Sequence, residues 1–110
     1  MRQVMRFQFN SDNQTPGNAE MAARIQDLTL RRLDRISSHL TRIEVHVGDI
    51  NGPRGGIDKR CSIEVRPAGM PPVSAVDQAD SIDAAVSGAT GKVLAAFDRQ
   101  IGKRTTRKGH

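Results

Sequence analysis

Basic residues recur at helical spacing in two segments of the chain. Two sets share a spacing of seven and then four positions: Arg24, Arg31 and Arg35, and Lys92, Arg99 and Lys103. At about 100° per residue, each set falls on one face of a helix. Two such rows, facing each other across a groove about one helix diameter wide, can hold the phosphates of an RNA helix without reading its sequence.

The distribution of charge supports a polyanionic partner. The chain carries 17 Lys and Arg against 12 Asp and Glu, a net charge of +5. Residues 99–110 hold five basic residues and no acid, so the whole excess lies at this end. Phosphates bound there would release counterions, which favours binding. The alternative is an ordinary solvated surface, since Asp27 and Asp34 lie beside the first row and can neutralise part of it.

The residues that could perform catalysis do not form a pattern. Cys61 alternates with apolar residues along a predicted strand, which is typical of a buried thiol. His39, His46 and His110 are scattered, and no spacing joins them to a nucleophile or to a set of metal ligands. The glycine-rich segment 51–61 lacks the helix that a nucleotide site needs and is predicted to be a hairpin loop. We therefore expect no enzyme activity, no cofactor and no metal.

Length and composition predict one small cytoplasmic domain. The chain has 110 residues, a single cysteine and only three aromatic residues, all Phe, so the core must be aliphatic and no internal disulfide can form. No apolar run approaches the roughly 20 residues that span a bilayer. The first residues lack the apolar stretch of a secretory signal.

Apolar periodicity predicts the elements that would position the basic rows. Alternation indicates strands over 4–9, 43–47, 61–65 and 73–76, and apolar arcs indicate helices over about 19–40 and from 82 onward. Thr15-Pro16 is typical of a helix start, and Asp80 or Ser81 should cap the last helix. Pro72 predicts that strand 73–76 lies at a sheet edge.

The order β-α-β-β-β-α predicts an α+β two-layer sandwich, with consecutive strands antiparallel and both helices on one face of a four-stranded sheet. Phe7 and Phe9 should face the core. The other face then offers mixed charges and no ring, which argues against RNA binding by base stacking. We expect one domain over residues 1–102 and a basic, disordered tail over 103–110.

Several motifs occur in the order and spacing of a known family. They are the opening with Thr15-Pro16, Leu30-Arg31-Arg32-Leu33-Asp34-Arg35, Ile43-Glu44-Val45, the segment from Asn51 to Cys61, Asp80-Ser81-Ile82-Asp83-Ala84-Ala85-Val86, and Lys92-Val93. On these motifs the chain resembles the ribosome hibernation-promoting and ribosome-associated inhibitor family, in its short form. The resemblance implies a fold like that of double-stranded-RNA-binding domains.

The resemblance also implies a function. Members of this kind bind small-subunit rRNA in the channel that holds mRNA and tRNA, and inhibit translation or stabilise idle ribosomes by steric exclusion. Arg32, Arg35 and Lys92 match basic positions of the family. The helical spacing adds five residues to these RNA-binding candidates: Arg24, Arg31, Arg99, Lys103 and Arg104.

Further expectations concern partners. We expect no membrane, no small-molecule substrate and no C-terminal dimerisation domain. The alternative hypothesis is a general RNA-binding module, or a modulator of another protein, without a role in hibernation.

Overall fold

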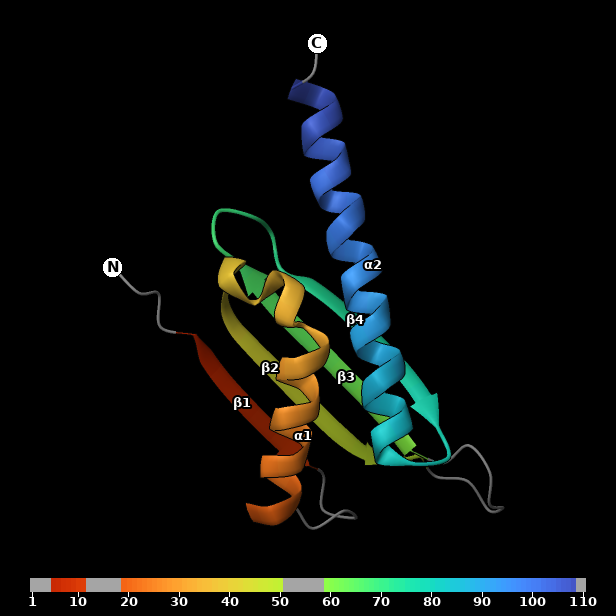
Figure 1. The fold of residues 1–110 in the computed structure, drawn as a ribbon. Coiled ribbons are helices and arrows are strands. Elements are labelled where there is room, and N and C mark those ends of the chain that lie inside the picture. Colours follow the sequence, from red (N-terminus) through yellow and green to blue (C-terminus); the bar gives the residue numbers. More distant parts are fainter. Residues whose placement is uncertain (1–4, 12–18, 51–58, 109–110) are drawn as a thin grey trace.

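The computed structural model describes residues 5–11, 19–50 and 59–108, and of residues 103–108 only the backbone. Its elements are β1 (Arg6–Ser11), α1 (Ala19–Arg32), the 3-10 helix η1 (Asp34–His39), β2 (Leu40–Asp49), β3 (Lys59–Pro67), β4 (Val73–Ala79) and α2 (Ile82–Lys108). Both long helices lie on one face of a single sheet (Figure 1). The predicted α+β fold, a four-stranded sheet under two helices, is confirmed. The predicted cap at Thr15-Pro16, and most of the 51–61 loop, lie outside the described residues.

The strands lie in the order β1-β2-β3-β4. The pairs β2–β3 and β3–β4 are antiparallel, as expected. The prediction that all consecutive strands are antiparallel was wrong for β1 and β2, which run parallel with Phe7 opposite Ile43. Parallel neighbours need a long crossover, and α1 with η1 supplies one. Strand β4 lies at an edge, as Pro72 predicted.

The core is aliphatic and lies between the sheet and the helices. Strands β2 and β3 contribute alternate residues that are fully buried, Val45 and Ile63 among them. Helix α2 covers them with Val86, Val93 and Phe97. Phe7 and Phe9 pack against this core but are only partly buried, because β1 is the other edge of the sheet.

The first helix is shorter than predicted. We expected it to continue to Leu40, but α1 ends at Arg32 and the chain continues as η1. The apolar residues Leu33 and Ile36 are three positions apart, and both are buried. A 3-10 helix has three residues per turn, so it keeps both side chains on the core side while the chain approaches β2.

The last helix begins as predicted and ends later. The backbone N–H of Ala84 donates to Oγ of Ser81 (3.1 Å), so Ser81 rather than Asp80 is the cap. The backbone of α2 stays helical to Lys108, where we expected a disordered tail. Gly102 costs a helix only about 1 kcal/mol, which is too little by itself to end the helix at that residue. The 27-residue helix extends beyond the sheet (Figure 1).

Candidate nucleic-acid interface

Two predicted RNA-binding arginines connect the helices to each other. Nη2 of Arg24 lies 3.1 Å from Oδ1 of Asp83. The guanidinium of Arg35 donates two hydrogen bonds of 3.0 Å to the two oxygens of Asp98. These ion pairs join the two sides where we expected an open groove between basic rows. Arg35 also leaves the predicted row on the first helix, because α1 ends before it and Arg35 lies in η1.

The two arginines at the end of α1 also have partners. Nε of Arg32 donates to the hydroxyl of Thr90 on α2 (2.7 Å), and this hydroxyl in turn donates to the carbonyl of Ser87 (2.8 Å). Arg31 pairs with Asp27 one turn earlier (3.1 Å), the neutralisation that the sequence made possible. Arg32 thus adds a third connection between the segment formed by α1 and η1 and the last helix, α2.

Lys92 lies between α2 and β4. Its Nζ is 3.0 Å from Oδ1 of Asp77 and 3.2 Å from the carbonyl oxygen of Val76. The carboxylate of Asp77 packs so closely on α2 that a Cβ at Gly88 would collide with it. Lys92 therefore neutralises an acid that the sheet places against the helix, a relation that the sequence did not reveal.

The C-terminal end of α2 differs from the rest of the helical layer. Arg99 is exposed, and within the described part of the chain it makes no ion pair. Lys103 and Arg104 follow on the same helix, and their side chains lie outside the described residues. No acid occurs after Asp98. The structure thus separates the eight predicted residues into a group held by ion pairs or hydrogen bonds (Arg24, Arg31, Arg32, Arg35 and Lys92) and a basic helical end.

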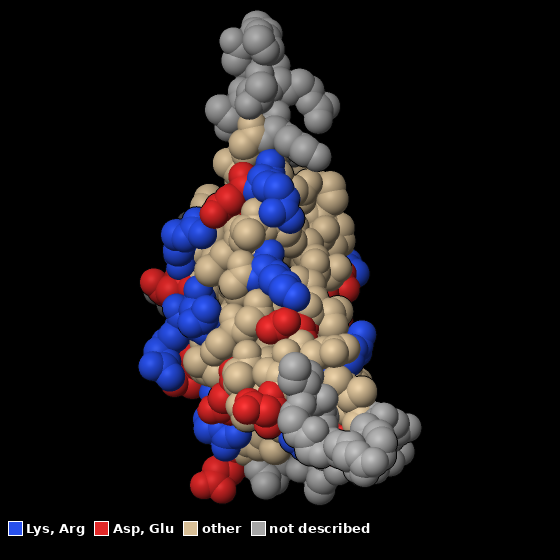
Figure 2. Space-filling model, turned by 90° about the vertical axis from the view of Figure 1, so that its right-hand side faces the viewer, with Lys and Arg blue, Asp and Glu red and all other residues tan. Residues whose placement is uncertain are grey.

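The surface reflects this mixture of charges. In Figure 2, which shows one side of the molecule, blue and red side chains alternate over the body rather than forming a continuous basic area. Hydrogen bonding to Arg35 lowers the pKa of Asp98 and raises the pKa of Arg35. Both side chains are more than half exposed, so solvent screens the pair and a phosphate can compete for the arginine.

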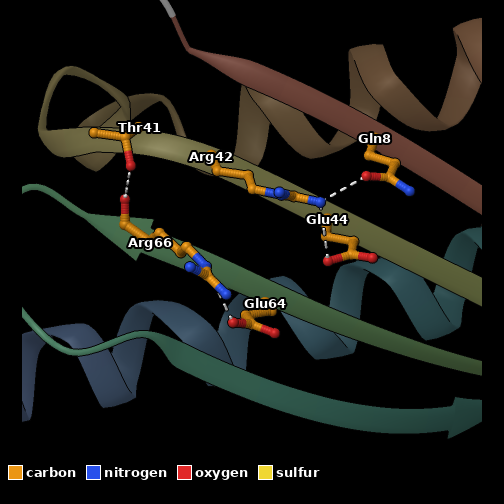
Figure 3. Close-up of polar contacts among 6 residues, drawn as sticks. All are labelled: Gln8, Thr41, Arg42, Glu44, Glu64 and Arg66. Carbon is orange, nitrogen blue, oxygen red and sulfur yellow. Dashed lines mark hydrogen bonds and ion pairs between the residues drawn. The ribbon is translucent and has the colours of Figure 1, made fainter.

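The face of the sheet that the helices do not cover, which we call the open face, carries a cluster of polar contacts that the sequence did not predict (Figure 3). Nη2 of Arg42 donates a hydrogen bond to Oε1 of Gln8 (2.7 Å) and lies 3.6 Å from Oε1 of Glu44. Nε of Arg66 lies 3.5 Å from Glu64. The predicted strand began at Ile43, so Arg42 was not assigned to this face. Alternation predicted that Arg6, Glu64 and Arg66 share this face, but it could not predict which residues of neighbouring strands are register partners.

The remaining chemical groups are Cys61 and the histidines. Burial, with a contribution from Asp77, raises the pKa of Cys61 to about 12, so the thiol stays protonated at neutral pH. The ring of His39 lies 6.0 Å from that of Phe97, whereas His46 is exposed on β2. In residues 5–11, 19–50 and 59–108 no three potential ligands cluster as a metal site would require. None of the described helices has the length and apolarity needed to cross a membrane.

Known proteins share this fold. A ribosomal subunit interface protein from Coxiella burnetii superposes with a TM-score of 0.69 at 15% identity, covering 89% of this chain and 99% of that one. The N-terminal domain of Protein Y from Thermus thermophilus superposes with a TM-score of 0.60 at 14% identity, covering 88% of this chain and 97% of that one. No curated protein matches the sequence. The profile of the family described as Sigma 54 modulation protein / S30EA ribosomal protein matches residues 14–108. The chain belongs to this family.

Proposed function

We propose that the protein binds rRNA of the small ribosomal subunit in the channel that holds mRNA and tRNA anticodon arms. Bound there, it inhibits translation or stabilises idle ribosomes by steric exclusion, in the cytoplasm and without catalysis. The observation that carries this proposal is family membership over residues 14–108. The fold supports it, because the Coxiella burnetii protein with this fold is named for the ribosomal subunit interface.

The basic end of α2 is the part of the molecule best suited to the first phosphate contacts. It begins at Arg99, contains no acid, and runs as a helix beyond the sheet (Figure 1). A helix is about 10–12 Å across with its side chains, so a projecting one can enter spaces that the two-layer body cannot. Its cations would bind phosphate without selecting sequence.

The ion-paired arginines can join this contact. The side chains of Arg24 and Asp83 are each 54% exposed. An exposed pair contributes little to stability, because water already solvates both charges. When an RNA phosphate approaches, Arg24 and Arg35 can exchange a carboxylate for the phosphate. Binding should then weaken steeply as salt rises, because each phosphate contact releases a counterion.

The proposal is tested with purified small subunits on sucrose gradients across a range of KCl concentrations. The protein should sediment with the subunits at low salt, and mRNA with initiator tRNA should displace it. Arg99→Glu should weaken binding, whereas Arg60→Glu, an equal charge change on an exposed residue of β3, should have a smaller effect. The proposal would be refuted if the protein did not sediment with the subunits, or if its binding changed neither with the KCl concentration nor on addition of mRNA and tRNA. Binding to any RNA with equal affinity would favour the general RNA-binding module.

A further inference from the structure

Strand register places three arginines level on the open face of the sheet. Arg6 on β1 is the partner of Arg42 on β2, and Arg42 is the partner of Arg66 on β3. We call these three residues the arginine row. Neighbouring strands are about 4.8 Å apart, so the row crosses about 10 Å of the sheet. Like charges directly opposite each other on adjacent strands destabilise a sheet, and a bound anion would relieve this repulsion.

The row is only partly neutralised by acids. Its neighbours are Glu44 and Glu64, which lie one row along the strands and approach Arg42 and Arg66 no closer than 3.6 and 3.5 Å. Among the described residues, Arg6 makes no ion pair. The pairs on the helical layer are shorter, at 3.0–3.1 Å. The arginine row is therefore less fully neutralised than Arg24, Arg31 and Arg35, the ion-paired arginines of the helical layer.

The central arginine is held in position. Gln8 accepts a 2.7 Å hydrogen bond from Nη2 of Arg42, and Nε of Arg42 is buried with no hydrogen-bond partner. Figure 3 shows Arg42 and Arg66 extended over the same face of the sheet, each beside the glutamate of its own strand. A guanidinium that is already ordered loses less entropy when it binds a ligand.

The chemistry of the face selects the kind of ligand. The three Phe residues of the chain all lie on the core side, and among the described residues of the open face only the exposed His46 carries a ring that could stack on a base. Among the residues that the structure describes, four arginines and two glutamates share the open face, Arg60 being the fourth arginine. Guanidinium groups bind phosphate oxygens through two parallel hydrogen bonds. The complementary ligand is a run of backbone phosphates.

We infer that the arginine row is a second phosphate-binding site, which holds an rRNA strand against the open face of the sheet. The inference rests on the proposed function and extends it. The helices and the end of α2 contact one wall of the ribosomal channel, and the arginine row contacts another. A protein bound on both faces fills the channel, which is what steric exclusion requires.

The test measures the dissociation constant for salt-washed small subunits over a KCl series. The variants are Arg6→Gln and Arg66→Gln, which are exposed and should fold normally, as far-UV circular dichroism would verify. Each should weaken binding about three- to tenfold and lower the slope of log K against log salt by about one. The matched control is Arg60→Gln, which removes an equal charge from the same face three rows away and should change binding by less than about twofold.

Two further variants should have the opposite effect. Glu44→Gln and Glu64→Gln remove the acids beside Arg42 and Arg66 and should strengthen binding about two- to fivefold. Wild-type protein that does not bind subunits would refute the proposed function and this inference with it. Wild-type binding with Arg6→Gln and Arg66→Gln unchanged, or with Arg60→Gln equally impaired, would refute the inference alone. If the arginine variants lose affinity for whole subunits but not for protein-free rRNA, the inference is refuted as well. That result would mean that the arginine row contacts a ribosomal protein.

Discussion

Alanine at Gly88 and alanine at Gly91 should change the stability of the protein in opposite directions. Both glycines lie inside α2, where alanine is favoured over glycine by about 1 kcal/mol. At Gly91 an added Cβ would meet only Nη2 of Arg32, at 4.0 Å. Gly91→Ala should therefore raise the free energy of unfolding by about 1 kcal/mol.

At Gly88 the gain in stability from replacing glycine by alanine is opposed by a clash with Asp77. An added Cβ would lie 2.6 Å from Cγ of Asp77, so the carboxylate has to rotate away. Leaving a preferred rotamer costs roughly 1 kcal/mol. The rotation also breaks the 3.0 Å pair with Lys92, which contributes about 1 kcal/mol at most because Lys92 is 58% exposed. Gly88→Ala should thus lower stability by about 1 kcal/mol, about 2 kcal/mol below Gly91→Ala.

Urea denaturation followed by far-UV circular dichroism is the suitable assay, because the chain has no Trp or Tyr for fluorescence. With an unchanged slope, the shift of the midpoint gives the change in free energy. Asp77→Ala supplies the control background. There, Gly88→Ala should stabilise the protein as Gly91→Ala does, which corresponds to a coupling of about 2 kcal/mol between positions 77 and 88.

Equal stabilisation by Gly88→Ala and Gly91→Ala in the wild-type background would refute this reasoning. It would mean that Asp77 does not occupy the space over Gly88 and that β4 and α2 are not in the contact described. A loss that persists after Asp77→Ala would place the obstruction in the Cβ at position 77, which lies 3.2 Å from the added Cβ, or in another side chain.

Four other predictions concern groups that are buried or ion-paired. The hydroxyl of Thr29 is buried without a hydrogen-bond partner, so Thr29→Val should raise the free energy of unfolding by about 1 kcal/mol; a lower melting temperature would contradict this. Because the pKa of Cys61 is raised to about 12, the thiol of the folded protein should resist alkylation by iodoacetamide at about pH 8.5. The free energy of unfolding should fall as the pH rises from about 9 toward 12, because the unfolded thiol ionises first. Prompt alkylation of the folded protein would refute the raised pKa of Cys61. Cys61→Ser should cost roughly 1–3 kcal/mol and leave subunit binding intact. Arg35 lowers the pKa of Asp98 in the folded protein. The ionised carboxylate therefore stabilises the fold at pH values above its ordinary pKa of 3.8, and this stabilisation is lost as the pH falls through the lowered pKa of the folded state. In the variant Asp98→Asn, the urea midpoint should therefore fall less between about pH 6 and about pH 3 than it does in the wild type. An equal fall in both proteins would show that the Arg35–Asp98 ion pair does not contribute to acid denaturation.

The sequence alone determined the elements and the layer to which most residues belong. Strand alternation around Val45 and Ile63 predicted a buried face, and burial confirms it. Such patterns are legible because each depends on a period of the local backbone, two for a strand and 3.6 for a helix. Pro72 likewise predicted an edge, since a proline cannot donate to a neighbouring strand.

Local patterns did not determine where a helix changes type. Leu33 and Ile36 suit the apolar arc of an α-helix and the three-residue turn of a 3-10 helix equally. The choice between them depends on how the chain must enter β2 to meet β1, which is a property of the whole sheet. The parallel pairing of β1 with β2 has the same origin, because alternation carries no information about strand direction.

Only the tertiary structure decided which charges meet. Asp83 and Asp98 are 59 and 63 residues from Arg24 and Arg35, and packing of α2 against α1 makes them partners. Strand pairing likewise places Arg42 level with Arg66. The spacing of basic residues along one helix shows which of them share a face, but not which acids the neighbouring helix brings to that face. A charge pattern in sequence therefore predicts a surface, and only packing determines how much of that surface remains free to bind RNA.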